Sequence, residues 1–371
     1  MRALLATRKG MFELTRQQDG QWALQLTGFI ADPVTMVLFD ARDGSEYAAL
    51  NLGHFGVKLH RRDAARRSEG SSGWQEVAVP AYPLQEQRAE GEAEWKLRMI
   101  WSLAAGGPDQ PGVLWAGTLP GGLFRSDDRG DSWQLVESLW NMPLRREWMG
   151  GGAEVPGIHS VCVDPRNSAR VLAGVSCGGA WLTEDGGASW VSSARGMRAN
   201  FMPPEQAEVE HVQDPHLIVQ CAGQPDQYWC QHHCGIWRSS NGGREWQQIK
   251  PQDDSGNAIS DFGFAVAVHP RDARIAWFAP ATSDQCRVPV TAALSVSRTR
   301  DGGKTFESLR HGLPQKDCYD LIYRHGLAVA PDGQTLLMGS TTGGLWVSEN
   351  GGDAWTEITH TLPPIYALQF A

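Results

Sequence analysis

The chain has 371 residues, of which 41% are hydrophobic and 20% charged, and its net charge is −9. This acidic balance argues against a duplex nucleic-acid partner, which would need a basic face. Seven cysteines, an odd number without the spacing of a small disulfide scaffold, favour reduced thiols and a cytoplasmic location. No apolar stretch has the length of a signal peptide or a membrane span, so we expect no membrane association.

The first predicted element is a short apolar strand, Ala3-Leu-Leu-Ala6. Two polar, turn-rich stretches follow it, and each ends on a tryptophan, at Trp22 and at Trp74. Both stretches look like degenerate copies of a phrase that becomes regular further along the chain. An internal repeat of this kind is a guide to the whole architecture.

From residue 126 onward the phrase occurs five times. A Ser or Thr is followed two residues later by Asp or Asn, then by glycine, and an aromatic residue closes the phrase. We expect a hairpin turn, because Asp bonds its own downstream backbone, glycine supplies positive φ and the aromatic starts the next strand. The copies are Ser126-Asp-Asp-Arg-Gly-Asp-Ser-Trp133, Thr183-Glu-Asp-Gly-Gly-Ala-Ser-Trp190, Ser239-Ser-Asn-Gly-Gly-Arg-Glu-Trp246, Thr299-Arg-Asp-Gly-Gly-Lys-Thr-Phe306 and Ser348-Glu-Asn-Gly-Gly-Asp-Ala-Trp355.

The closing aromatics lie 57 residues apart (133 to 190), then 56 (190 to 246), 60 (246 to 306) and 49 (306 to 355). With Trp22 and Trp74, this spacing gives seven units. Each unit divides into four strands, and the first often ends in a proline turn, as in Val161-Cys-Val-Asp-Pro165. Roughly 50 residues per four-stranded unit suits a propeller blade. We therefore predict one all-β domain over residues 1–371, a seven-bladed β-propeller of four-stranded antiparallel blades.

The repeated phrase resembles the Asp-box, or BNR, repeat of bacterial sialidases and related β-propellers. The resemblance implies that these hairpins lie on the outer rim and are structural. Asn241 and Asn350 replace the aspartate in two copies. A true sialidase is not indicated, because those enzymes have six blades and an Arg-Ile-Pro motif that this chain lacks. Seven-bladed Asp-box proteins also resemble photosystem assembly factors, which hold partner proteins on a propeller face.

The two ends of the chain predict how the ring closes. Ile365-Tyr-Ala-Leu-Gln-Phe370 is typical of an innermost strand, whereas Ala3-Leu-Leu-Ala6 is typical of a second strand. We expect the C-terminal strand to complete the N-terminal blade.

Long loops gather on the face opposite the repeated phrases. In a four-stranded meander, the loops that lead into the first strand and those that join the second to the third lie together. Insertions on one face of a rigid scaffold usually mark the binding face. We therefore expect a polar site where the central channel opens on this face. The loops are 81–95, 145–154, 198–216, 51–54, 227–235 and 281–289.

Carbohydrate hydrolysis or lysis is the first chemistry to consider, because the resemblance to Asp-box enzymes implies it. Glycoside cleavage needs two carboxyl groups, about 5 Å apart for retention or about 6.5–9.5 Å apart for inversion. Asp261, Asp317 and Asp320 come just before predicted innermost strands and are the catalytic candidates. The ligand-binding candidates are the other polar and aromatic residues of this face, Lys96, Arg98, Glu147, Trp148, His159, Arg287 and Tyr319.

Metal chemistry is an alternative, because Cys230-Gln-His-His-Cys234 holds four potential ligands in five residues. His232 and His233 could bind zinc or copper, and His216 or one of His54, His159 and His211 could join them from neighbouring blades. The two adjacent histidines should diverge if the backbone is extended. Packed cysteines and hydrogen-bonded histidines are the competing interpretation of this loop.

A protein-binding scaffold without chemistry is the remaining alternative. The loops of the elaborated face are rich in His, Asp, Glu and Arg rather than in large apolar residues, which favours an enzyme. We expect a monomer that binds a small polar or carbohydrate ligand, with a protein partner as the other possibility.

Overall fold

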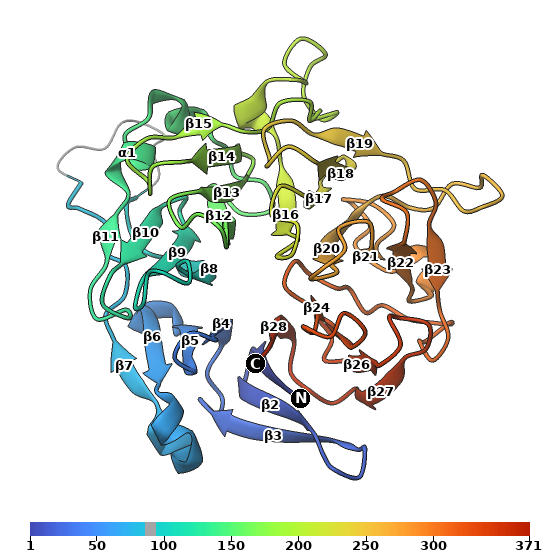
Figure 1. Ribbon diagram of the computed structural model, residues 1–371, viewed down its shortest axis with the longest axis horizontal. Helices are drawn as coiled ribbons and strands as arrows, with labels where there is room; N and C mark the ends of the chain where they lie inside the picture. The colour runs from blue at the N-terminus through green and yellow to red at the C-terminus, as the bar shows by residue number, and fades with distance from the viewer. Residues whose placement is uncertain (86–93) are drawn as a thin grey trace.

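Seven four-stranded antiparallel sheets stand around a central axis in the computed structural model of the protein (Figure 1). The structure describes residues 1–85 and 94–371. The prediction of a seven-bladed β-propeller is confirmed. Part of the loop 81–95, residues 86–93, lies outside the described residues.

Each blade extends from an innermost strand beside the axis to an outermost strand at the rim. In that order, the first blade contains β28 (Ile365–Phe370), β1 (Arg2–Thr7), β2 (Gly10–Arg16) and β3 (Trp22–Gly28). The second contains β4 (Val34–Asp40), β5 (Ser45–Asn51), β6 (Val57–Arg62) and β7 (Gln75–Val77). The third contains β8 (Met99–Ala105), β9 (Leu114–Leu119), β10 (Leu123–Ser126) and β11 (Gln134–Leu135). The fourth contains β12 (Gly157–Val163), β13 (Val171–Ser176), β14 (Gly179–Thr183) and β15 (Val191–Ser192).

The remaining three blades follow the same order. The fifth contains β16 (Pro215–Gln220), β17 (Tyr228–His232), β18 (Gly235–Ser239) and β19 (Gln247–Ile249). The sixth contains β20 (Gly263–Val268), β21 (Ala276–Pro280), β22 (Val296–Thr299) and β23 (Glu307–Leu309). The seventh contains β24 (Leu327–Val329), β25 (Leu336–Gly339), β26 (Leu345–Ser348) and β27 (Thr356–Thr359).

Helices are short and lie in the connections between strands. They are α1 (Glu137–Trp140), η1 (Gly53–Phe55), η2 (Ala64–Gly73), η3 (Pro143–Glu147), η4 (Glu210–Val212) and η5 (Val290–Ala292).

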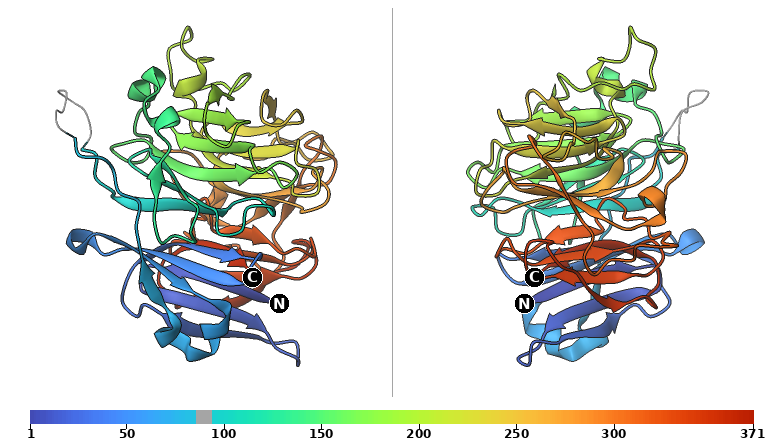
Figure 2. Two further views of the ribbon diagram at one scale, coloured as in Figure 1. Left: turned by 60° about the vertical axis from the view of Figure 1, so that its left-hand side comes forward. Right: turned by 90° about the vertical axis from the view of Figure 1, so that its right-hand side faces the viewer.

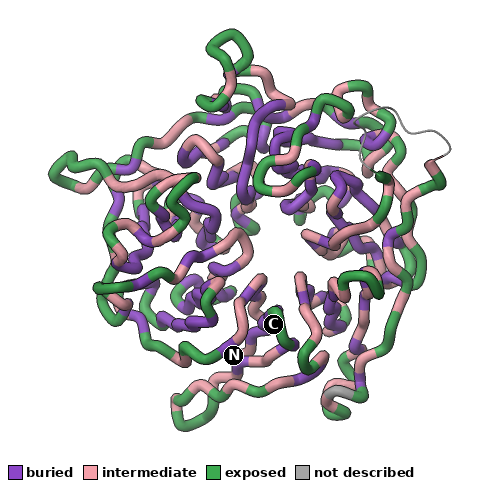
Figure 3. Tube along the Cα trace, turned by 180° about the vertical axis from the view of Figure 1, so that it is seen from behind, coloured by how far each residue is buried: buried purple, intermediate pink, exposed green. Residues whose placement is uncertain are grey.

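The core consists of layers between neighbouring blades. Central strands such as β13 are buried along their whole length, because a blade covers each of their faces. Outer strands such as β15 keep an exposed side (Figure 3). Eleven of the sixteen tryptophans are buried, and Trp115, Trp181 and Trp229 are among the largest fully buried side chains.

The repeated phrase forms the turn between the third and fourth strands of a blade. In the fourth blade, β14 ends at Thr183 and β15 begins at Val191. The hydroxyl of Thr183 accepts the N–H of Gly187 at 2.9 Å, and Asp185 accepts the N–H of Ser189 at 2.9 Å. The closing Trp190 is buried, as the hairpin interpretation requires.

The C-terminal strand closes the ring. β28 pairs antiparallel with β1, with Leu5 opposite Leu368 and Ala3 opposite Phe370. The two termini therefore lie in one blade, close to each other in every view (Figure 2). This is the predicted closure, and it leaves no innermost strand unpaired.

No helix in the described ranges is both long and apolar enough to cross a membrane. All seven cysteines are free thiols.

Candidate functional site

A cavity of about 1260 Å³ opens at the centre of the ring, on the face predicted from the long loops. Its lining comes from segments that lead into innermost strands, such as Gly150–Ala153, and from second-to-third-strand turns, such as Asn51–Gly53. The repeated phrases connect third to fourth strands and thus lie at the opposite ends of the blades. The rim carries the exposed apolar side chains of Phe55, Phe201 and Met149.

Aromatic rings form much of the cavity wall. Phe264 of β20 is buried, and the ring of His216 stacks on it with centroids 4.5 Å apart and an interplanar angle of 14°. Tyr323 meets Phe264 edge-on at 4.8 Å. Trp101 of β8 lines the same cavity from another blade.

Three arginines, Arg8, Arg287 and Arg324, also line the cavity. The guanidinium of Arg324 lies 4.7 Å from the ring centroid of Trp101 and 5.6 Å from that of Phe264. Its Nε is buried without a hydrogen-bond partner, and no described carboxylate lies within ion-pair distance of it. Burial lowers the pKa of Arg324 and Asp214 opposes that effect; a guanidinium nevertheless stays charged in proteins.

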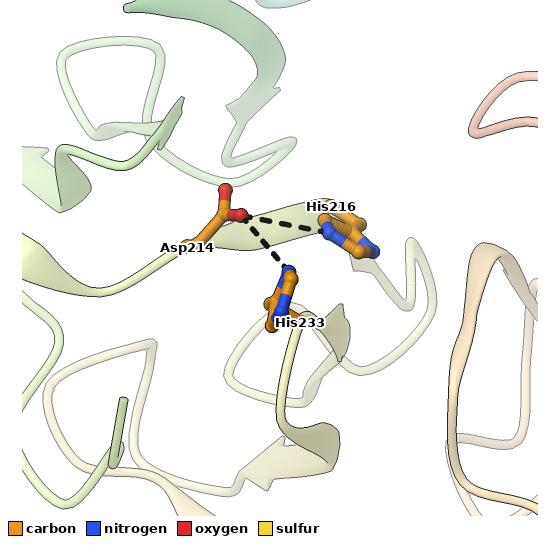
Figure 4. Close-up of side chains that lie close together, drawn as sticks. All are labelled: Asp214, His216 and His233. Carbon is orange, nitrogen blue, oxygen red and sulfur yellow. Dashed lines mark ion pairs between the residues drawn. The ribbon is translucent and has the colours of Figure 1, made fainter. Parts of the chain in front are cut away.

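The side chains of Asp214, His216 and His233 lie together (Figure 4), and all three line the same cavity as the arginines. Oδ2 of Asp214 lies 3.6 Å from Nε2 of His216 and 3.5 Å from Nδ1 of His233. One ligand-type atom from each residue lies within 4.8 Å of the others. Asp214 and His216 are buried, whereas His233 is partly exposed to the cavity.

The environment favours the ionised form of Asp214. Burial opposes ionisation of Asp214, but the contacts with His216 and His233 outweigh it and hold the pKa of Asp214 well below its usual value. Burial lowers the pKa of His216, although Asp214 opposes that shift. Asp214 is therefore an ionised carboxylate at neutral pH and cannot serve as a proton donor.

The three aspartates proposed as catalytic lie outside the cavity lining. Asp261 pairs with Lys250 at 3.4 Å. Asp317 is exposed beside Lys316, with 74% of its side chain accessible. Asp320 accepts hydrogen bonds from Thr342 and, at 2.7 Å, from Ser340. Each carboxylate thus has its own local partner, and the cavity brings together a different set of groups.

Among the proposed ligand-binding residues, the cavity lining contains Arg287 alone. Trp148 is buried against Trp181, with ring centroids 5.6 Å apart, so its face is not presented to a ligand. His159 is fully buried behind Trp101. The others lie at the surface away from the lining: Lys96, Arg98 paired with Glu154, Glu147 paired with His211, and Tyr319.

The Cys/His loop divides between the core and the cavity. His232 is fully buried, and its ring nitrogens face the backbone N–H groups of Asp214 at 3.0 Å and Cys234 at 2.9 Å. Cys230 belongs to a hydrophobic core cluster. His233 lies in the turn after β17 and lines the cavity instead.

Sequence reasoning missed Asp214 and Arg324. Asp214 directly precedes Pro215 at the start of β16, two residues before the predicted candidate His216. His216 was predicted because it lies at the start of an innermost strand, and the same reasoning applied to Asp214 would have identified it. Arg324 was missed because Asp317 and Asp320 were expected to come just before the innermost strand, whereas β24 begins at Leu327.

Comparison with known proteins supports the fold. No known protein family matches the chain. A probable oligoxyloglucan-reducing end-specific xyloglucanase from Neosartorya fischeri is 35% identical over 86 residues, which are 23% of this chain and 9% of the relative. The GH74 xyloglucanase of Xanthomonas campestris superposes with a TM-score of 0.64 and 19% identity, over 96% of this chain and 52% of that enzyme.

The protein is a seven-bladed β-propeller similar in fold to GH74 xyloglucanases. YCF48 bound to a D1 peptide superposes with a TM-score of 0.50 and 14% identity, over 88% of this chain and 82% of that one. The chain spans about half of the GH74 enzyme and under a tenth of the curated relative. Because the identities are only 19% and 14%, these two solved structures support the fold alone. Unrelated functions can be built on one fold.

Proposed function

We propose that the central cavity is the active site of an enzyme that acts on a small organic anion, with an acidic sugar as its ligand class. The observation that carries this proposal is Arg324, whose charged group lines the cavity with no hydrogen-bond or ion-pair partner among the described residues. A desolvated cation favours an anionic partner, and the planar guanidinium suits a carboxylate.

The remaining lining fits the same ligand class. Arg8 and Arg287 add positive charge, and Trp101 and Tyr323 offer aromatic surface for a sugar ring. A cavity of about 1260 Å³ has room for more than one sugar residue. The likeness to xyloglucanases makes a carbohydrate the first ligand to test. We also propose a cytoplasmic location, because the seven cysteines are free.

Two-carboxylate glycoside hydrolysis is not the reaction that this geometry favours. Such hydrolysis needs a carboxylic acid with a raised pKa, and Asp214, the most buried carboxylate of the cavity, has the opposite shift. The imidazole of His325, which also lines the cavity, suits removal of a proton next to a carboxylate, as in an elimination. We therefore favour a lyase that cleaves an acidic sugar.

Binding of D-galacturonate and of D-galactose, compared by calorimetry, tests the ligand class. We expect galacturonate to bind at least about tenfold more tightly, because charge-assisted hydrogen bonds contribute about 1.5–3 kcal/mol. Arg324→Gln should remove this difference. The control is Arg195→Gln, since Arg195 is an exposed arginine paired with Glu245 outside the cavity. Equal affinities for the two sugars would refute the proposal.

Products of an oligogalacturonide test the reaction class. An elimination yields new reducing ends together with the ultraviolet absorbance of an unsaturated product, whereas hydrolysis yields reducing ends alone. Reducing ends without that absorbance would exclude the lyase and leave the ligand class intact.

A protein-binding scaffold is the second candidate, because Phe55 is 72% and Phe201 43% exposed at the cavity rim. Exposed aromatic residues are typical of sites that bind proteins. A peptide ligand would be weakened by Phe55→Ser and little affected by Arg324→Gln, whereas an acidic sugar predicts the reverse order.

A further inference from the structure

The cluster of Asp214, His216 and His233 has a spacing that hydrogen bonding does not explain. The two nitrogen-to-oxygen distances are 3.6 Å and 3.5 Å. N–H···O hydrogen bonds are shorter, at about 2.7–3.2 Å. Ligand atoms held tetrahedrally at about 2.1 Å from one metal ion lie about 3.4 Å from each other. The two separations from Asp214 therefore match ligands of one ion better than partners in a hydrogen bond.

His216 is held in the orientation of a metal ligand. Its Nδ1 lies 2.7 Å from the backbone carbonyl oxygen of Gly263. Because a carbonyl oxygen only accepts, Nδ1 carries a proton, and Nε2 is the nitrogen that can bind a metal. That nitrogen lies 3.6 Å from Oδ2 of Asp214, so one cation between the two atoms would contact both. Metal-binding histidines usually donate their other N–H in this way.

Asp214 is also oriented by its surroundings. Its Oδ1 accepts hydrogen bonds from the hydroxyl of Ser176 at 3.1 Å and from the N–H of Cys177 at 3.0 Å. Both bonds go to one oxygen, and they leave Oδ2 directed at the two histidines. The carboxylate thus offers one oxygen to the cluster without having to rotate.

His233 completes the set from the turn after β17. Its Nδ1 faces Asp214, and its Nε2 lies 3.7 Å from Oδ2 of Asp284. The carboxylate of Asp284 thus lies near the nitrogen that faces away from Asp214. His233 and Asp284 both line the cavity, so the fourth position of the metal would open to it.

The backbone beside the cluster leaves room for an ion. A Cβ placed on Gly151 would lie 3.3 Å from Oδ2 of Asp214, 3.2 Å from Sγ of Cys177 and 2.7 Å from Oγ of Ser176. Any side chain at this position would press into the space in front of the carboxylate. Glycine keeps that space free.

We propose that Asp214, His216 and His233 bind one divalent metal ion, with zinc as the metal that this ligand set suits. Two imidazoles and one carboxylate with an open fourth position are a ligand set of catalytic zinc sites. The Cys/His loop contributes one ligand to this site, His233, while its cysteines pack elsewhere. The site is independent of the ligand proposed for Arg324, since it rests on the geometry of these three residues.

The test is titration of the chelator-treated protein with ZnCl₂ by calorimetry, together with the visible absorption spectrum of the protein loaded with Co²⁺. We expect one zinc ion per chain. His233→Gln should weaken binding at least about 100-fold and remove the cobalt bands, because it removes one of three ligands. His233 is partly exposed, so its replacement is better tolerated than that of buried His216.

His54→Gln is the matched control, because His54 is exposed between two residues of the cavity lining and belongs to no such cluster. It should bind zinc like the wild type. Zinc should also raise the melting temperature of the wild type, since a ligand of the folded state stabilises it. Failure of the folded wild type to bind zinc, or unchanged affinity in His233→Gln, would overturn the proposal. Neither measurement involves a sugar, so a failure to bind zinc would leave the proposed binding of an acidic sugar untouched.

Discussion

At the scale of single residues, Gly151 sets how much space the cluster of Asp214, His216 and His233 leaves open. A methyl group there would approach Ser176 to 2.7 Å and Asp214 to 3.3 Å. Its neighbour Gly152 is different, since a Cβ would meet only Nη1 of Arg287 within 4 Å, at 3.7 Å. Two adjacent glycines of one loop thus provide a test and its control.

Gly151→Ala should weaken zinc binding at least about tenfold, because the added methyl displaces the carboxylate or occupies the space in front of it. Gly152→Ala should leave zinc affinity unchanged. Calorimetric titration of both variants with ZnCl₂, after circular dichroism has verified their folding, provides the measurement. Equal zinc affinities in the two variants would contradict the proposed position of the metal.

The sequence was sufficient to predict the face that carries the site, and it named His216, His233 and Arg287. It could not predict which polar residues converge, because convergence depends on where each innermost strand begins. Asp317 and Asp320 were expected just before an innermost strand, whereas β24 begins at Leu327. A shift of a few residues along a strand moves different side chains to the channel mouth.

At the scale of elements, the repeated phrase stabilises the hairpin at the outer edge of each blade that carries it. In the sixth blade, Asp301 accepts the N–H groups of Lys304 at 2.9 Å and Thr305 at 3.0 Å, and the hydroxyl of Thr305 at 2.8 Å. In the degenerate first copy, Asp19 accepts one hydrogen bond, from the N–H of Gln21 at 2.9 Å. The phrase could be identified from sequence because each of these bonds is local.

Asp301→Ala should lower the free energy of unfolding by about 1–3 kcal/mol, because it removes the acceptor of several backbone and hydroxyl groups. Asp19→Ala should cost less than about 1 kcal/mol, since one bond is lost. Urea unfolding at neutral pH measures both. A loss as large for Asp19 as for Asp301 would mean that the bonds of the phrase do not determine its stability. Ligand and zinc affinities should be unchanged in both variants, because the phrases lie at the other end of the blades.

At the scale of the whole molecule, seven blades that pack around an axis leave histidines buried near the centre of the ring. The ring itself was predictable, because the period of the phrase and the apolar strands at both termini are visible in the sequence. The burial of these histidines was not, since it arises from contacts between blades. His159 in the fourth blade is fully buried and covered by Trp101 of the third, whereas His325, before β24, is half-buried at the cavity wall and lies 3.0 Å from the carbonyl oxygen of His159.

These two desolvated histidines predict that the propeller loses stability in mild acid. Burial lowers the pKa of His159 well below its usual value, and it lowers the pKa of His325 to about 4. In the unfolded chain both titrate near about pH 6.5. Below that pH the unfolded chain binds protons at these histidines, whereas the folded chain does not. The free energy of unfolding therefore decreases as the pH falls below about 6.5. For each histidine the decrease is up to about 1.4 kcal/mol per pH unit, and for His325 it continues down to about pH 4.

Urea unfolding between pH 7.5 and pH 5, with a chelator present throughout, measures this slope. His159→Phe keeps an aromatic ring against Trp101 and removes one titrating group, while Ser160 still accepts the N–H of Ile218 at 3.0 Å. We expect this variant to lose stability less steeply below pH 6.5, by up to about 1.4 kcal/mol per pH unit. His54→Gln, at an exposed position, should keep the wild-type slope. An unchanged slope in His159→Phe would show that His159 takes up its proton in the folded ring as readily as in the unfolded chain.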